Sequence, residues 1–166
     1  EIYKMTALII IFISLSLMGS ALWVLPPKRE RLKMALRMKA RQLGLTVQLT
    51  SIDLPDKWDK TTTAHNVCAY RLYRGKAVDS LPANTWLLSY EVWKYVEICE
   101  GWWCNNSMPI PKVVTDSLME YGDYLRGIEI TPEAVSFYWH ERGDEAMLEA
   151  MSDLLYKLEK MHSIGR

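Results

Sequence analysis

The sequence contains none of the short motifs that most often mark an active site. It has no phosphate-binding loop, no glycine-rich dinucleotide fingerprint, no G-x-S-x-G nucleophile turn and no H-E-x-x-H metal motif. Internal repeats and low-complexity tails are also missing. We therefore predict that the protein is not an enzyme and needs no cofactor.

Cysteine is scarce, with only Cys68, Cys99 and Cys104, and an odd number does not make a complete disulfide framework. Together with His65 they form a ligand set that zinc accepts, and Cys99 and Cys104 alone could form a redox pair. The C-x-x-C spacing of most zinc and redox sites is missing. Burial of the cysteines as small apolar residues is the simpler interpretation, and a metal-binding or redox domain is the alternative.

The net charge is zero, but the charges are segregated along the chain. Residues 28–41 hold seven Lys and Arg against one Glu, whereas residues 42–166 hold 12 basic and 18 acidic residues. Nucleic-acid binding requires clustered cations that contact phosphates. The acidic balance of the main part therefore argues against a nucleic-acid partner.

A long apolar run, Met5–Leu25, has 21 residues and no charge. As a helix it would span about 31 Å, which matches the roughly 30 Å hydrocarbon core of a bilayer. A cleaved signal peptide usually has a basic start and a shorter apolar run, and a buried core helix is usually shorter. We predict that residues 1–27 are a transmembrane anchor, ended or kinked by Pro26 and Pro27.

The flanks of the anchor predict its orientation, since cytoplasmic flanks carry an excess of Lys and Arg. One lysine precedes the run, and seven Lys and Arg follow within 16 residues of Leu25. We expect a single-pass protein of a bacterial inner membrane, with its N-terminus outside and its C-terminal domain in the cytoplasm, where thiols stay reduced.

Residues 28–44 are predicted to form a basic amphipathic helix that ends at Gly44. Such a helix can flank a membrane span and pack on the domain, and it can also lie against anionic lipid, at about 1 kcal/mol for each cation near the surface. The residues predicted to lie at the membrane surface are Lys28, Arg29, Arg31, Lys33 and Arg37.

Residues 45–166 are predicted to form a cytoplasmic α+β domain with a mainly antiparallel sheet and packed helices. Alternating, β-branched and aromatic segments predict strands, and apolar stripes at helical spacing predict helices. The predicted strands are 45–52, 67–74, 86–99 (one long strand or two short ones), 128–130 and 134–140, and the predicted helices are 112–121 and 144–160. The polar stretch Asp53–His65 is predicted to be a loop.

Two further segments contain reactive or aromatic side chains. Trp102 and Trp103 follow Gly101 in a predicted turn, where they are candidates for a partner contact; one buried ring and one half-exposed ring is the alternative. His140 and Glu141 could act as an acid–base pair, but neighbours on a strand face opposite sides and would not converge on one substrate.

Three segments together carry a resemblance to a known group. The segment from Leu25 to Arg37 (LPPKRERLKMALR) after an N-terminal span, Gly44-Leu45, and Tyr138–Gly143 (YWHERG) resemble uncharacterised single-pass membrane proteins of gammaproteobacteria. Some of these proteins are labelled YajC-like preprotein translocase subunits. The resemblance implies an anchor, a basic segment and a small β-rich part, and it implies no catalytic residue.

These observations lead to one leading prediction and two alternatives. The protein is predicted to be a non-catalytic accessory or assembly subunit of a larger inner-membrane complex, and its other partner is the lipid bilayer. A membrane-tethered metal-binding or redox domain that uses His65, Cys68, Cys99 and Cys104 is the first alternative. A membrane-surface sensor that acts through the basic segment is the second.

Overall fold

The structure, a computed structural model, describes residues 1–24, 27–58 and 60–161. The chain divides into two compact units, residues 1–34 and residues 35–166, which we describe separately. The predicted helix break at Pro26 lies outside the described residues.

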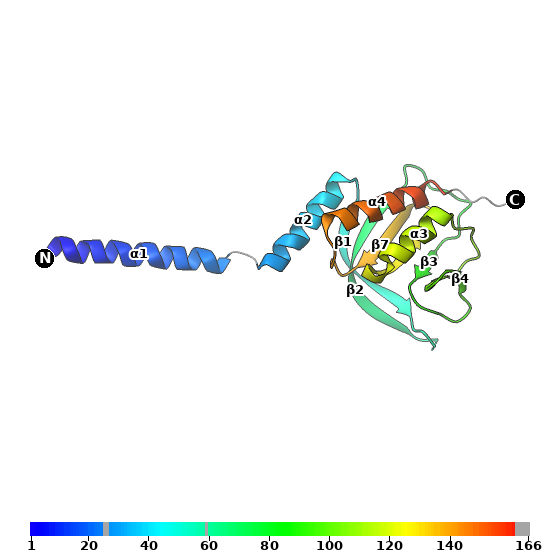
Figure 1. Ribbon diagram of the computed structural model, residues 1–166, viewed down its shortest axis with the longest axis horizontal. Helices are drawn as coiled ribbons and strands as arrows, with labels where there is room; N and C mark the ends of the chain where they lie inside the picture. The colour runs from blue at the N-terminus through cyan, green and yellow to red at the C-terminus, as the bar shows by residue number, and fades with distance from the viewer. Residues whose placement is uncertain (25–26, 59, 162–166) are drawn as a thin grey trace. The chain divides into compact units, whose positions relative to one another are not determined.

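The first unit contains helix α1, Ile2–Val24, drawn in dark blue in Figure 1. Its segment Ile2–Ala21 is long and apolar enough to cross a membrane, with a mean hydropathy of 1.9, and none of it is buried. The hydroxyl of Thr6 donates to the carbonyl oxygen of Ile2, and that of Ser20 donates to the carbonyl oxygen of Leu17, both at 2.9 Å. These bonds let polar residues occupy an apolar helix. A helix packed in a soluble core would be buried, so this alternative does not fit.

Helix α2, Lys28–Gln42, begins in the first unit and ends in the second. Its end confirms the predicted role of Gly44, which has a φ of +81°. The amide of Gly44 donates to the carbonyl oxygen of Arg41, and the amide of Leu45 donates to that of Ala40. This pattern is a Schellman cap, and it turns the chain from α2 directly into the first strand.

An antiparallel sheet of seven strands forms the centre of the second unit and confirms the predicted α+β class. Its strands lie in the order β1-β2-β7-β6-β3-β5-β4. Their bounds are β1 Thr46–Pro55, β2 Thr62–Tyr73, β3 Thr85–Leu88, β4 Val96–Cys99, β5 Trp102–Cys104, β6 Leu125–Ile130 and β7 Ala134–Trp139.

The prediction of a loop at Asp53–His65 is wrong at both ends, since Asp53–Pro55 belong to β1 and Thr62–His65 belong to β2. β1 and β2 pair without interruption from Thr46 opposite Arg71 to Pro55 opposite Thr62, which leaves only a short connection. The side chains of Thr61 and Thr63 donate to the carboxylate of Asp56, at 2.6 and 2.9 Å, and so close the hairpin. Polar composition suggested a loop here, but the threonines are β-branched and suit a solvent-facing strand.

The structure also tests the predicted strand segment 86–99 and the two predicted helices of the domain. The segment predicted as one or two strands contains two short ones, β3 and β4, and β5 is a strand that the sequence did not predict. Both predicted helices are confirmed within one residue at each end. Helix α3 is Lys112–Tyr121, followed by a short 3-10 turn at Gly122–Tyr124, and α4 is Glu145–Glu159.

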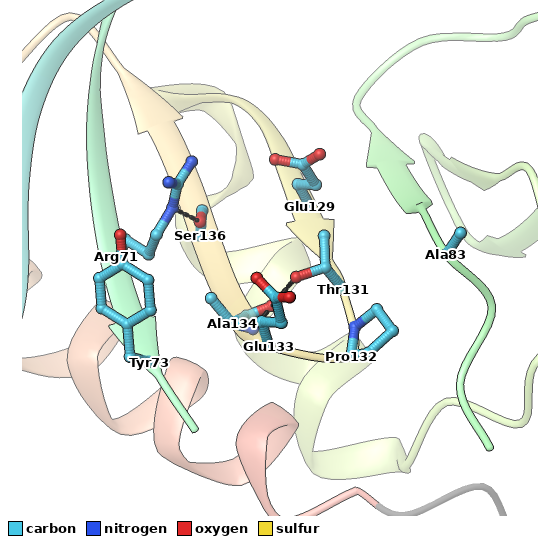
Figure 2. Close-up of a pocket in the computed structure, with 9 residues that line it drawn as sticks. All are labelled: Arg71, Tyr73, Ala83, Glu129, Thr131, Pro132, Glu133, Ala134 and Ser136. Carbon is cyan, nitrogen blue, oxygen red and sulfur yellow. Dashed lines mark hydrogen bonds between the residues drawn. The ribbon is translucent and has the colours of Figure 1, made fainter. Parts of the chain in front are cut away.

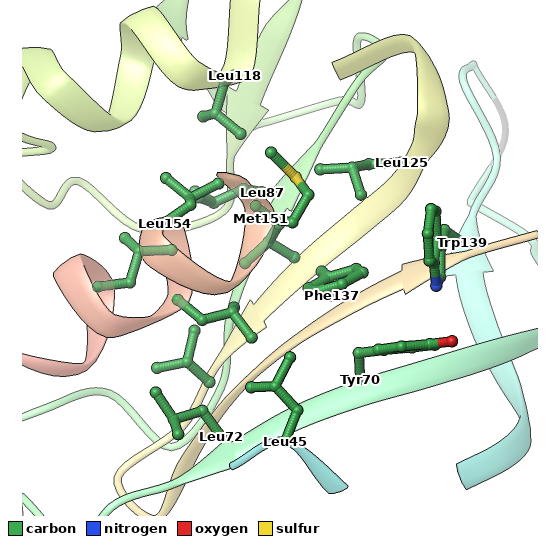
Figure 3. Packing of buried hydrophobic residues seen from close by; sticks show 14 of the residues in the cluster. Leu45, Tyr70, Leu72, Leu87, Leu118, Leu125, Phe137, Trp139, Met151 and Leu154 are labelled. Carbon is green, nitrogen blue, oxygen red and sulfur yellow. The ribbon is translucent and has the colours of Figure 1, made fainter. Parts of the chain in front are cut away.

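Helices α3 and α4 lie side by side against one face of the sheet, as Figure 1 shows, and the second half of α2 also packs on this core. Beneath them, three aromatic rings form the centre of the core (Figure 3). Tyr70 stacks on Phe137 with ring centroids 5.2 Å apart, and Trp139 meets both rings edge-on. From α2, Leu36 and Ala40 are buried in the same core.

Among the residues that the structure describes, the opposite face of the sheet has two small apolar clusters and no helix. In one of them Leu54, near the end of β1, packs with Leu88 of β3 and with Val92. The hydroxyl of Tyr90 donates to the carbonyl oxygen of Pro55 at 2.8 Å. The far end of the β1–β2 hairpin therefore curls over this face and is fixed against the segment that follows β3.

Candidate functional site

The residues predicted to lie at the membrane surface occupy two different environments along α2. Lys28, Arg29 and Arg31 are exposed. Lys33 is half-buried, and its ammonium group lies 3.3 Å from a carboxylate oxygen of Glu30 one turn earlier. The first half of the helix therefore presents cations to its surroundings, as a membrane-flanking segment requires.

Arg37 instead forms a bidentate ion pair inside the second unit. Its Nε and Nη2 atoms each donate to a carboxylate oxygen of Glu141, both at 2.7 Å. The Glu141 side chain is only 3% exposed, and it also accepts a hydrogen bond from the hydroxyl of Tyr70 at 2.9 Å. The sequence placed Arg37 among the lipid-facing cations, but this geometry gives it a structural partner 104 residues away.

The protonation states of the cluster follow from its geometry. Burial raises the pKa of the Glu141 carboxyl, but the hydrogen bonds from Arg37 and Tyr70 outweigh burial and hold its pKa below the ordinary value. The hydrogen bond to Glu141 raises the pKa of Arg37, so this pair remains ionised at neutral pH.

Cys68 lies in the same cluster, with its sulfur 3.6 Å from Arg37 Nη2. Burial and the neighbouring Glu141 carboxylate raise the pKa of its thiol to about 11. Nucleophilic attack requires the thiolate, so the raised pKa makes Cys68 a poor nucleophile at neutral pH. Cys68 is therefore a protonated, buried residue, in agreement with the simpler interpretation of the cysteines.

The four proposed metal ligands do not come together. Cys68 and His65 are on β2, whereas Cys99 and Cys104 are on β4 and β5, with β7, β6 and β3 between them. At a strand spacing of about 4.8 Å, β2 and β5 are about 19 Å apart. Among the described residues, which include all four candidates, no three His, Cys, Asp or Glu side chains are placed to share a metal ion.

The two adjacent tryptophans adopt the alternative arrangement, with one ring buried and one half-exposed. Trp102 is 3% exposed and belongs to the main core, where its indole fills the space beside Gly122. Trp103 is half-buried and pairs with Leu88 of β3 and Glu97 of β4. Trp103 is therefore the more accessible of these two candidates for a partner contact.

His140 and Glu141 point to different surroundings, as their positions at a strand end predicted. His140 is exposed, and its Nε2 atom accepts a hydrogen bond from Arg126 at 3.0 Å. Partial burial and the nearby Arg126 and Arg142 lower the pKa of His140. Since Glu141 is held in the buried cluster, the two do not share a substrate position.

A hollow of about 440 Å³ lies on the sheet face opposite α3 and α4 (Figure 2). Arg71 Nε donates to the hydroxyl of Ser136 at 2.9 Å, and the hydroxyl of Tyr138 donates to the carboxylate of Glu129. The side chain of Thr131 bonds to the backbone of Ala134. These polar groups are already paired with one another, which is typical of a structural network.

An exposed group of aromatic and basic side chains was not predicted from the sequence. Trp58 is 76% exposed in the β1–β2 connection, and Trp93 is 60% exposed in the connection from β3 to β4. The ammonium groups of Lys60 and Lys94 lie 4.9 and 4.3 Å from the centroid of the Trp93 ring. We call Lys60, Trp93 and Lys94, together with Trp58 from the same connection as Lys60, the aromatic tip.

The aromatic tip is held in shape by contacts beneath it. The bond from Tyr90 joins the β3–β4 connection to Pro55 at the end of β1, and the Lys60–Trp93 contact joins the two connections that form the tip. Large exposed aromatic side chains on an ordered surface are typical of protein contact sites. The signal in the sequence was weak, because Lys57, Lys60 and Lys94 give both segments the polarity of ordinary loops.

No protein-family model matches the chain, and comparisons with curated proteins and with solved structures gave no match. The resemblance to single-pass proteins of gammaproteobacteria therefore stays a prediction.

Proposed function

We propose that this protein is a non-catalytic accessory or assembly subunit of a bacterial inner-membrane complex, held in the membrane by α1. The observation that carries the proposal is the aromatic tip, since Trp58 and Trp93 present large apolar rings at the surface of the folded domain. Aromatic residues of this kind dominate the binding energy of many protein interfaces.

The location in the proposal rests on α1 and on the cations that follow it. Ile2–Ala21 meets the requirements for a membrane span, and Lys28, Arg29 and Arg31 are exposed directly after it. A flank of this sign is retained on the cytoplasmic side during insertion. In this proposal the C-terminal domain lies in the cytoplasm and the N-terminus of the chain lies outside. The basic segment then contacts anionic lipid.

The proposal is tested by isolating the full chain from its native membrane in a mild detergent, with the wild type and Trp58→Ser/Trp93→Ser compared side by side. We expect a partner in stoichiometric amount with the wild type and its loss with the double variant. Both tryptophans are exposed, so the fold of the variant should be retained.

A matched control is Tyr124→Ser, which removes an aromatic ring that is 48% exposed and lies outside the tip. The control should retain the partner. A wild-type chain that is isolated alone would contradict the proposed function, and loss of the partner with the control as well would contradict the role of the aromatic tip.

A further inference from the structure

The two edges of the sheet differ in their protection against pairing with another strand. The β4 edge has only four residues, its pairing shifts register between Glu97 and Cys99, and Glu97 is exposed. Short length, a bulge and a charge are the usual devices that prevent an edge from pairing. This edge is therefore closed to a further strand.

The β1 edge has none of these devices along most of its length. β1 has ten residues and pairs with β2 in continuous register. Its residues Thr46–Ile52 carry no charge and no proline. In the part of the chain that the structure describes, β1 pairs with β2 alone, so its outer N–H and C=O groups form a free edge.

One side chain on this edge is also unusual for a free surface. Leu49 is 70% exposed at the middle of β1. It lies opposite Cys68 of β2 and therefore on the face that α2, α3 and α4 cover elsewhere. An apolar side chain beside free backbone hydrogen-bonding groups suits the addition of a further strand.

We propose that β1 pairs antiparallel with β1 of a second copy of this chain, about a two-fold axis at Leu49. In this register Leu49 faces Leu49 of the other copy, Gln48 faces Thr50 and Thr46 faces Ile52. Residues that lie opposite each other in an antiparallel pair share a face, so both copies direct their helices to the same side of one continuous sheet.

The sequence of β1 is suited to pairing with β1 of a second copy. The proposed register brings the exposed leucines together and places no like charges opposite each other, because the paired segment is uncharged. A two-fold interface of this kind closes after two copies and does not lead to a filament. The dimer is independent of the partner proposed for the aromatic tip, and either can fail alone.

Disulfide formation in the full chain, in mild detergent, tests the dimer and its register. The parent variant carries Cys68→Ala and Cys99→Ser, because a cysteine at position 49 would otherwise pair with Cys68 on the neighbouring strand. Opposite residues in antiparallel strands have Cα atoms about 4.5–5.5 Å apart, within the range of a disulfide. We expect mild oxidation to convert most of the Leu49→Cys protein to a covalent dimer.

The matched control is Ser51→Cys, two residues along the same exposed face. In the proposed register the two copies of position 51 are about 14 Å apart, so they should give no more dimer than the parent. Equal dimer yields from both variants would overturn the register. A parent-level yield from Leu49→Cys would overturn the dimer, and so would a disulfide between Leu49→Cys and a different protein in the detergent extract.

A second variant tests the dimer without oxidation. Leu49→Arg places like charges opposite each other at the two-fold axis, and the exposure of Leu49 leaves the fold of one copy unaffected. Light scattering of the full chain should give a dimer for the wild type and a monomer for the variant. The same mass for both proteins would overturn the proposal.

Discussion

Both halves of α2 are rich in basic residues, but they have different roles. In residues 28–34 the cations are exposed or lie close to Glu30, and in residues 35–42 Leu36 and Ala40 enter the core while Arg37 binds buried Glu141. The boundary between the two compact units of the chain falls between these halves.

The comparison shows that the contribution of a cation to folding depends on the partner it binds and not on its residue type. Arg29 and Arg37 are two turns apart on one helix, yet Arg29 is exposed and Arg37 compensates a carboxylate that is almost fully buried. Removing a buried charge from its partner is costly, whereas removing an exposed cation has little effect on folding. The following variants test this difference, beginning with the largest expected effect on stability.

Arg37→Ala should destabilise the domain most, because it leaves the Glu141 carboxylate buried without its main partner. We expect a loss of about 2–3 kcal/mol in the free energy of unfolding, somewhat less than for a fully buried pair, because Arg37 is itself partly exposed. Denaturant titration of the full chain in detergent measures the change, with Arg29→Ala as the control. Equal stability of the two variants would remove the distinction between the halves.

The cost of Arg37→Ala should depend on pH. In the wild type the pKa of Glu141 is lowered, so the stability that the pair contributes is present above the ordinary pKa of a glutamate and is lost as the pH falls through the lowered value. Without Arg37, burial raises the pKa of Glu141. The carboxyl is then protonated as the pH falls, and the neutral group destabilises the variant less than the buried charge does. The difference in unfolding free energy should therefore narrow from pH 7 to below pH 4, and a constant difference would contradict the assigned role of Glu141.

Gly44→Ala should have an intermediate effect. The left-handed φ of +81° costs an alanine about 1–2 kcal/mol, and the added carbon would lie 2.9 Å from the hydroxyl of Tyr156, which caps the carbonyl oxygen of Leu43. Gly75→Ala is the control, since nothing lies within 4 Å of the added carbon there. Thermal unfolding compares the two, and a control as damaging as Gly44→Ala would argue against the Schellman cap as the cause.

The smallest effect on stability is expected from Lys28→Gln/Arg29→Gln/Lys33→Gln, which neutralises cations of the first half. The unfolding midpoint should stay at the wild-type value, whereas a fraction of the chains should insert with the domain on the opposite side of the membrane. Protease accessibility in spheroplasts measures that fraction. If this variant were less stable than the wild type but inserted in the wild-type orientation, the roles given to the two halves of α2 would be wrong.

Local sequence patterns were sufficient to predict the helices and part of each long strand. The apolar run of α1, the stripe of α4 and the glycine after α2 each reflect a rule that acts within one or two turns of chain. The β1–β2 hairpin was longer than predicted, because its end is stabilised by Leu54 against Leu88 and Val92, which are distant in the sequence.

The candidate site was less predictable, because its roles depend on contacts between distant segments. Arg37 carries the same local signal as Arg29, and only the fold brings it to Glu141. Trp58 and Trp93 lie in segments with the polarity of loops, and the contact of Lys60 with Trp93 joins them across the fold. Conversely, His65 and the three cysteines formed a plausible ligand set in composition but are divided between distant strands.

The most direct test of the account is protease treatment of intact spheroplasts that contain the full chain, with detection of the C-terminal domain. The account predicts that residues 35–166 remain intact until the membrane is broken and are digested afterwards. Digestion of the domain in intact spheroplasts would contradict the proposed cytoplasmic location, which rests on the cations that follow α1.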